Sequence, residues 1–198
     1  MLLGLASSTL LSSITATALA QQGPSAVETP PAANYWKSFA LGCGVSILAH
    51  ETAHILTSFA VGAHPYIAFS KGRPTVYSGI DSDRHPHKQF LFSSAGLVTQ
   101  SLINEAILDI PHSGGGAIER GILAGGIGTT LFYITLGRNG SVSDISVMAR
   151  TSSLSKTQLS LIFGGVSAIQ AWRISRDSRY QHFFARPTAN GAVFGFSY

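Results

Sequence analysis

Two histidines and a glutamate lie inside an apolar stretch of the chain, in the segment His50-Glu51-Thr52-Ala53-His54. Residues at positions i and i+4 share one face of a helix, so the imidazoles of His50 and His54 can reach the same cation. The glutamate beside the first histidine can then hold and deprotonate a water molecule on that cation. This H-E-x-x-H pattern therefore predicts a metal site with Glu51 as a general base.

The stretch that carries these residues, Phe39–Val61, is long enough to span the hydrocarbon core of a bilayer as one helix. An ionisable side chain at the centre of such a helix costs about 3 kcal/mol to insert. A bound cation compensates that cost, which strengthens the metal hypothesis. The alternative is that the three side chains are polar helix positions satisfied by neighbouring helices.

Composition also indicates an integral membrane protein. Only 11% of the 198 residues are charged, where about 25% is usual for soluble domains, and the mean hydropathy is +0.26. The net charge of +4 comes partly from Arg173, Arg176, Arg179 and Arg186. These arginines suit anionic lipid headgroups, and no nucleic-acid motif accompanies them, so we expect lipids and no nucleic acid as partners.

The chain divides into four parts by composition. Residues 1–20 resemble a signal peptide that ends in Ala18-Leu19-Ala20, with an uncleaved anchor as the alternative. Residues 21–35 are rich in Pro and Ala and predict a flexible lead-in. Residues 36–172 form the membrane domain, and residues 173–198 form a basic tail.

Four apolar segments predict an all-α, polytopic membrane bundle of about four core helices: Phe39–Val61, Gln89–Leu108, Gly121–Gly137 and Thr157–Trp172. Gly121 and Gly125 form a G-x-x-x-G pattern, which lets helices approach closely. Between the first two segments, Tyr66–Ser70 and Thr75–Ser78 flank a Lys-Gly-Arg-Pro turn. They predict a short β-hairpin, with an irregular polar loop as the alternative.

We expect a location in the bacterial inner membrane with the N-terminus outside. The distribution of Lys and Arg does not decide this orientation: seven lie in the loops that would then face the cytoplasm, and six lie on the other side.

The H-E-x-x-H segment resembles the zinc metallopeptidases, and two branches of that group are similar to different parts of the chain. Site-2 protease-like intramembrane proteases carry an Ala-Gly-Pro-x-x-Asn element, which the run from Ala95 to Gln100 resembles with Leu for Pro and Gln for Asn. Their third ligand is an aspartate, for which Asp144 is the counterpart here, although the usual following glycine and nearby prolines are missing. The predicted hairpin fits this branch, because an edge strand can take a substrate by strand addition.

The second branch is the glutamate zincins, whose N-E-x-x-x-D element the segment Asn104–Asp109 resembles. Glu105 would be the third ligand, and Asp109 would orient a ligating histidine. Glu105 follows His54 by fifty-one residues, which is farther than in that family. At about 1.5 Å per residue it also lies 7–8 Å deeper than Gln100, the position level with His50. Asp144 lies beyond the third apolar segment, so its loop would have to fold back into the membrane to reach the metal. Both candidates therefore stay open, with Glu105 slightly preferred.

Together these resemblances imply a membrane-embedded zinc metalloendopeptidase. His50 and His54 would bind Zn²⁺ with Glu105 or Asp144, a water would take the fourth position, and Glu51 would be catalytic. Hydrogen bonds from Asp109, Asn104 and Gln100 would support the ligands. A membrane-associated polypeptide would bind along the hairpin at Tyr66, Thr75 and Tyr77. The alternatives are a non-catalytic membrane protein with a structural or metal-binding cluster, and an ion or metal carrier; the oligomeric state is open.

Overall fold

The structure is a computed structural model that describes residues 32–70, 72–112, 115–180, 183–188 and 191–196. The predicted signal peptide and most of the predicted lead-in lie outside the described residues. Residues 32–35, which we expected to belong to the lead-in, are already helical.

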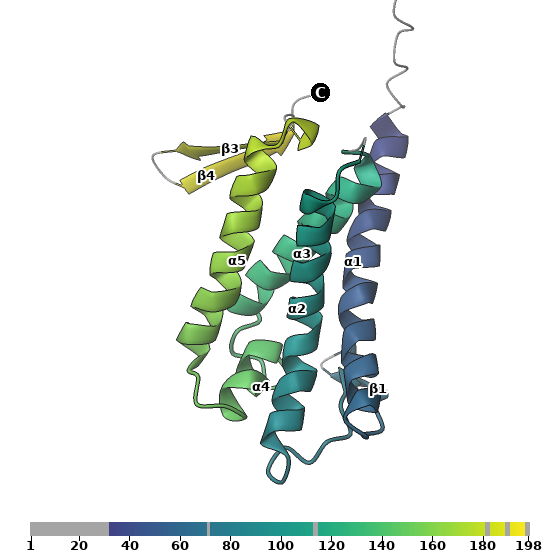
Figure 1. The fold of residues 1–198 in the computed structure, drawn as a ribbon, viewed down its shortest axis with the longest axis vertical. Coiled ribbons are helices and arrows are strands. Elements are labelled where there is room, and N and C mark those ends of the chain that lie inside the picture. The colour runs from purple at the N-terminus through teal and green to yellow at the C-terminus, as the bar shows by residue number, and fades with distance from the viewer. Residues whose placement is uncertain (1–31, 71, 113–114, 181–182, 189–190, 197–198) are drawn as a thin grey trace, which may run out of the picture. The chain divides into compact units, whose positions relative to one another are not determined.

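The fold is mostly helical, as predicted (Figure 1). Four long helices coincide with the four apolar segments of the sequence, and a fifth, short helix was not predicted. The helices are α1 (Ala32–Ala60), α2 (Pro86–Asp109), α3 (Ala117–Ile134), α4 (Asp144–Arg150) and α5 (Lys156–Arg176). Proline at the first position of α2 is suited to a helix start, and a capping box formed by Ser155 and Gln158 begins α5.

Glycines bring α1 and α3 into backbone contact. A Cβ atom at Gly42 would clash with the carbonyl oxygen of Ile118, and a Cβ atom at Gly121 would clash with that of Phe39. A Cβ atom at Gly125 would lie 2.8 Å from the Cβ of Ser46. Because the contacts advance in the same direction along both helices, α1 and α3 run parallel. The G-x-x-x-G pattern lies in their interface.

The other two long helices run the opposite way. His50 and His54 of α1 contact Gln100 and Phe92 of α2, so α1 and α2 are antiparallel. Gln170 of α5 contacts Ser101 and Asn104 of α2, while Arg173 contacts Asp109, so α2 and α5 are parallel.

The predicted hairpin is confirmed. Strands β1 (Tyr66–Ser70) and β2 (Arg73–Tyr77) pair antiparallel, with Tyr66 opposite Tyr77 and their rings stacked 5.2 Å apart. The turn is shorter than predicted, because Ser70 already pairs with Arg73, and it uses Gly72 at φ +78°. After a 3₁₀ turn at Ser178–Tyr180, β3 (Phe183–Thr188) and β4 (Gly191–Phe196) form a second antiparallel hairpin.

The unpredicted helix α4 is held by an apolar cluster. Ile145 and Met148 of α4 are fully buried against Leu97 of α2 and Leu159 of α5. A separate cluster forms near the opposite ends of α2 and α5. Packing of α4 therefore turns the chain back between α3 and α5, and it fixes the position of Asp144 at the start of α4.

Among the described residues, one helix is long and apolar enough to cross a membrane. It is the part of α1 from Asn34 to Ala60, close to the N-terminus.

Candidate metal centre

The structure brings together three side chains that can ligate a metal: His50, His54 and Asp144. All three are buried, with exposed fractions of 2%, 3% and 6%. The Nε2 atoms of the two histidines are 3.1 Å apart, and Asp144 Oδ2 lies 3.1 Å from that of His50 and 3.4 Å from that of His54.

These separations match the edges of a small tetrahedral site. Zinc binds histidine nitrogen and carboxylate oxygen at about 2.0–2.1 Å, so two ligands of a tetrahedral ion lie about 3.3–3.4 Å apart. The three measured separations, 3.1, 3.1 and 3.4 Å, lie close to this value. One ion could therefore contact all three atoms with little movement of the side chains.

Hydrogen bonds fix the tautomer of both histidines. His54 Nδ1 is 2.7 Å from the carbonyl oxygen of Phe92, and His50 Nδ1 is 3.0 Å from Oε1 of Gln100. Both partners are acceptors, so each Nδ1 carries the proton and donates it. In a neutral imidazole this leaves Nε2 with a free lone pair, which is the state that binds a metal.

The amide of Gln100 is itself held in one orientation. Its Nε2 donates to the carbonyl oxygen and hydroxyl of Ser46, at 3.1 and 3.0 Å, and to Thr129 Oγ1 at 3.3 Å. Its Oε1 is therefore the atom that faces His50. Because Gln100 is only 1% exposed, this chain of contacts from α3 through α2 to α1 is rigidly packed.

Asp144 supplies the negative charge of the cluster. Burial alone would raise the pKa of its carboxyl group, but without a metal the positive charge of the imidazoles of His54 and His50 in their protonated form outweighs burial and holds the pKa at about 2. Its Oδ2 atom is buried without a hydrogen-bond partner. Two nitrogen lone pairs and one carboxylate oxygen thus face a common point, an arrangement that needs a cation or extra protons. Histidine nitrogen and carboxylate oxygen are ligands that zinc accepts.

Close packing orients the His50 ring. A Cβ atom at Gly96 of α2 would lie within contact distance of the imidazole, 2.6 Å from Nδ1, so only glycine leaves room for the ring. On the other side, the ring of Tyr133 from α3 stacks on His50 with centroids 5.6 Å apart and planes 9° apart. The imidazole is therefore held between two helices.

A cavity of about 480 Å³ opens beside the cluster. Glu51, His54 and Asp144 all line it, and Thr75 of β2 forms part of its wall. Ser143 also lines it, and its hydroxyl is buried without a hydrogen-bond partner although it occupies the N-cap position of α4. A serine there usually caps the helix, so this hydroxyl has an unused donor beside the cavity.

The structure places Glu105 elsewhere. Its carboxylate forms an ion pair with Arg173 and accepts a hydrogen bond from Gln170 at 3.1 Å, and Asp109 pairs with the same arginine. Asn104 donates to Gln170 at 3.1 Å. This arrangement favours Asp144 as third ligand over Glu105, and it separates Asn104 and Asp109 from the histidines. Gln100 is the one residue of that predicted supporting set that contacts a ligand.

The predicted substrate-binding residues of the hairpin are divided. Thr75 lines the cavity of the metal cluster, whereas Tyr77 lines a neighbouring cavity of about 300 Å³. Tyr66 is 55% exposed and lines neither.

Sequence reasoning missed several residues of this site. The carbonyl of Phe92 could not be found, because a backbone acceptor carries no residue signal. Ser46, Tyr133 and Ser143 belong to common residue types in apolar or loop segments, and their role depends on tertiary packing. The spacing of Ser46 and His50, four residues apart on one helix face, was the available signal for Ser46.

No protein-family model, curated protein or solved structure matches the chain.

Proposed function

We propose that the protein is a polytopic membrane zinc metallopeptidase that hydrolyses peptide bonds of membrane-associated polypeptides. The observation that carries this proposal is the convergence of His50 Nε2, His54 Nε2 and Asp144 Oδ2 on one point, with Glu51 in the same cavity. Three protein ligands with an open side and an adjacent carboxylate are typical of catalytic zinc sites.

The distribution of polar and apolar side chains supports a membrane location beyond α1. In a soluble helix the exposed face is polar, but α2 exposes large apolar side chains and buries amide and hydroxyl groups beside its buried apolar residues. The buried polar residues of α2 are Gln89, Ser93, Gln100 and Asn104, and its exposed apolar residues are Leu91, Val98 and Leu102.

Helix α5 likewise exposes apolar side chains and buries polar ones beside Leu159 and Ile174. It buries Ser167 and Gln170, whereas Leu161 is 71% exposed and Ile169 is 58% exposed. Extended apolar surface on several helices would aggregate in water, but it is suited to contact with lipid chains. We therefore propose that α2, α3 and α5 lie in the bilayer together with α1.

In the proposed reaction, zinc when bound would polarise the scissile carbonyl and acidify the attacking water. His50 and His54 would hold the ion, while Gln100 and the Phe92 carbonyl keep their Nδ1 protons in place. The Glu51 carboxylate would accept the proton of the attacking water and deliver it to the leaving amine nitrogen. Ser143 would donate its free hydroxyl to the peptide carbonyl oxygen in the cavity.

The hairpin supplies a place for an extended peptide. Its sheet contains two described strands, so β2 is an edge strand on the side away from β1. Pro74, Thr75 and Val76 of this strand line the cavity of the metal cluster. A substrate added to this edge would run past Glu51 and be held by main-chain hydrogen bonds, largely independent of its sequence.

Zinc content of the detergent-solubilised protein tests the metal site. We expect near-stoichiometric zinc in the wild type, and loss of zinc in His54→Ala and in Asp144→Asn. Glu105→Gln is the matched control for removal of a carboxylate and should keep its zinc. Absence of bound metal in the wild type, even after zinc is added, would refute the proposal.

Catalysis is tested separately with Glu51→Gln on a mixture of fluorogenic peptides. The variant should keep zinc and lose cleavage, because only the proton carrier is removed. Zinc in the wild type without any cleavage would instead indicate a structural metal site in a non-catalytic membrane protein. Zinc flux into proteoliposomes would indicate a carrier.

A further inference from the structure

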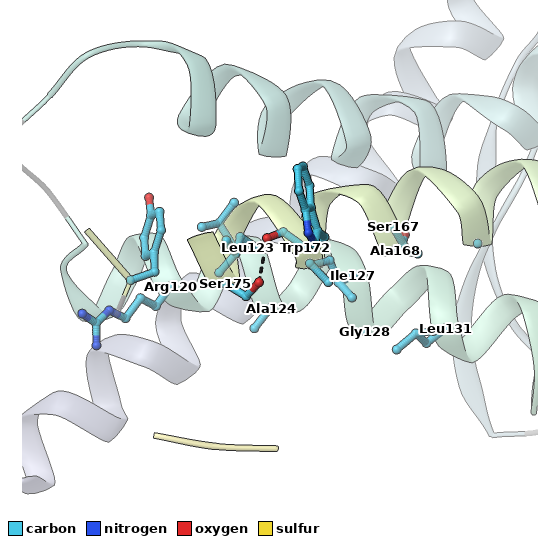
Figure 2. A pocket seen from close by; sticks show the side chains of 14 residues that line it. Arg120, Leu123, Ala124, Ile127, Gly128, Leu131, Ser167, Ala168, Trp172 and Ser175 are labelled. Carbon is cyan, nitrogen blue, oxygen red and sulfur yellow. Dashed lines mark hydrogen bonds between the residues drawn. The ribbon is translucent and has the colours of Figure 1, made fainter. Parts of the chain in front are cut away.

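A second cavity lies between α3 and α5, away from the metal cluster (Figure 2). Its volume is about 540 Å³, within the range of small-molecule sites, and its walls are almost entirely apolar. Small residues on both helices make room for it. Those that line it are Ala124 and Gly128 of α3 and Gly164, Ala168 and Ala171 of α5.

The space in this groove is open rather than closely packed. A Cβ atom added at Gly128 would meet nothing within 4 Å, although the residue lies in the middle of α3. Ser167 also lines the groove. It is only 3% exposed, and it has no hydrogen bond to another described residue. The surface is therefore shaped for an occupant with little polarity along its length.

One end of the groove is cationic and aromatic. Arg120 lines this end; its Nη2 donates to the carbonyl oxygen of Arg179 at 3.3 Å, whereas its Nε atom is buried without a hydrogen-bond partner. Trp172 also lines the groove, and the guanidinium of Arg176, a residue one helical turn farther along α5 that does not itself line the groove, lies 5.6 Å from the centre of the indole ring. Tryptophan and arginine are enriched where a membrane meets water.

Charge pairing leaves these two arginines available. Arg173 is neutralised by Glu105 and Asp109, and Arg179 is neutralised by Asp177. Among the described residues, Arg120 and Arg176 have no ion pair with a carboxylate. An anionic group at this end of the groove would supply one.

We propose that this groove binds an anionic phospholipid, with an acyl chain between α3 and α5 and the phosphate at Arg120 and Arg176. The proposal rests on the membrane location proposed above but not on the metal site. The groove extends from Arg120 to Leu131, eleven residues or about 16 Å of helix. That length matches one leaflet, since the hydrocarbon core of a bilayer is about 30 Å thick.

A lipid fits these observations better than a helix from a partner or from a second copy. A helix could pack on the small residues, but it would not account for two unpaired cations and an indole at one end. A phospholipid has one anionic headgroup followed by an apolar chain. The groove has a matching arrangement, with arginines near one end and apolar walls along the rest. These two features together identify the class of ligand.

Quenching of Trp172 fluorescence tests the proposal directly. The full chain with Trp36→Phe carries Trp172 as its single tryptophan, so its signal reports on this site. It is reconstituted in phosphatidylcholine that contains a small fraction of either brominated phosphatidylglycerol or brominated phosphatidylcholine. We expect stronger quenching by the anionic lipid, with about a fivefold preference for each arginine that contacts the headgroup.

Three variants separate the parts of the site. Arg120→Gln with Arg176→Gln should abolish the preference for the anionic lipid while leaving the signal in phosphatidylcholine. Gly128→Leu should lower quenching by both lipids, because its side chain fills the groove. Gly44→Leu is the matched control, since Gly44 is another helical glycine with open space at Cβ, and it should behave like the parent protein.

Equal quenching by the two brominated lipids, or a preference that survives loss of both arginines, would overturn the proposal. Absence of quenching in the parent protein, together with cross-linking of Gly128→Cys to a second chain, would show that a helix occupies the groove. Zinc content is measured on the same samples. Unchanged zinc with no lipid preference would reject the lipid site alone, and loss of the metal site would leave the quenching result intact.

Discussion

Two polar clusters lie on different helices, one on α1 and α4 and the other on α2 and α5, and their carboxylates face opposite kinds of neighbours. Asp144 faces the Nε2 atoms of two histidines whose protons are on the far side of the rings. Glu105 and Asp109 face the guanidinium of Arg173. The second cluster already contains a cation for its carboxylates, whereas the first presents three electron-rich atoms to one point. The difference shows why the same residue types support structure in one place and indicate a ligand site in the other.

Burial sharpens the contrast. The Asp144 side chain is 8% exposed, but those of Glu105 and Asp109 are 34% and 64% exposed. Solvent screens the Arg173 pairs and reduces what they contribute, while the histidine cluster has no such screening. The metal cluster is therefore expected to respond much more strongly to substitution than the arginine cluster.

The largest effect is expected from removing the charge of Asp144, and removing the charge of Glu105 is the matched control. Asp144→Asn removes the only anionic ligand and should reduce zinc from near-stoichiometric to background, measured by elemental analysis. Glu105→Gln removes an equal charge from the arginine cluster and should leave zinc unchanged. The reverse result would transfer the third-ligand role to Glu105.

A smaller effect is expected from the two buried amides of α2. Gln100→Leu removes the acceptor of the His50 Nδ1 proton and should weaken zinc binding about 10–100-fold, measured by competition with a chelating dye. Asn104→Leu removes an amide of equal burial that contacts Gln170 instead of a ligand. It should alter stability without altering zinc affinity, and equal loss in both variants would contradict the assigned roles.

The arginine cluster should show a modest effect on stability alone. Arg173→Gln leaves Glu105 and Asp109 without their cation, and the free energy of unfolding should fall by about 1 kcal/mol, as for partly exposed ion pairs. Denaturation of the detergent-solubilised protein by added SDS measures it. Loss of zinc in this variant would show that the two clusters are coupled.

The smallest effect concerns His112, which lies at the surface near the start of α3. A hydrogen bond from its Nε2 to Glu119 raises the pKa of His112, with a further contribution from the Ile110 carbonyl and opposition from the nearby Arg179. A raised pKa in the folded state means that this contact stabilises the protein below about pH 6.5 and that its contribution is lost as pH rises through the folded value. The unfolding temperature should therefore fall slightly between about pH 6 and about pH 8.5.

Glu119→Gln is the control for the pH experiment, because it removes the charge that His112 faces. The slope with pH should flatten in this variant. An unchanged slope would assign the pH dependence to another group.

The sequence was sufficient for the long helices and the first hairpin because their signals are local. Apolar segments of helical length correspond to α1, α2, α3 and α5, and two β-prone runs around a glycine turn correspond to β1 and β2. The H-E-x-x-H spacing brings His50 and His54 together for the same reason. Each of these features depends on neighbours within a few residues.

Long-range packing decided what the sequence could not. Asp144 lies in a polar, glycine- and serine-rich stretch, and it reaches the histidines because Ile145 and Met148 bury themselves against α2 and α5. Glu105 and Asp109 share a helix face as expected, but their partner Arg173 comes from a helix more than sixty residues later. A local motif shows which side chains lie together, and the fold decides what they face.

The position of α4 has a consequence for when, during synthesis of the chain, the three candidate ligands can come together. His54 and Asp144 are ninety residues apart in sequence, and the segment that carries Asp144 is anchored by Leu159 of the last long helix. A chain still emerging from the ribosome has both histidines long before it has the anchored carboxylate. If the cluster binds a metal as proposed, capture with the full ligand set would wait until synthesis has passed α5, and a nascent or truncated chain would remain without metal.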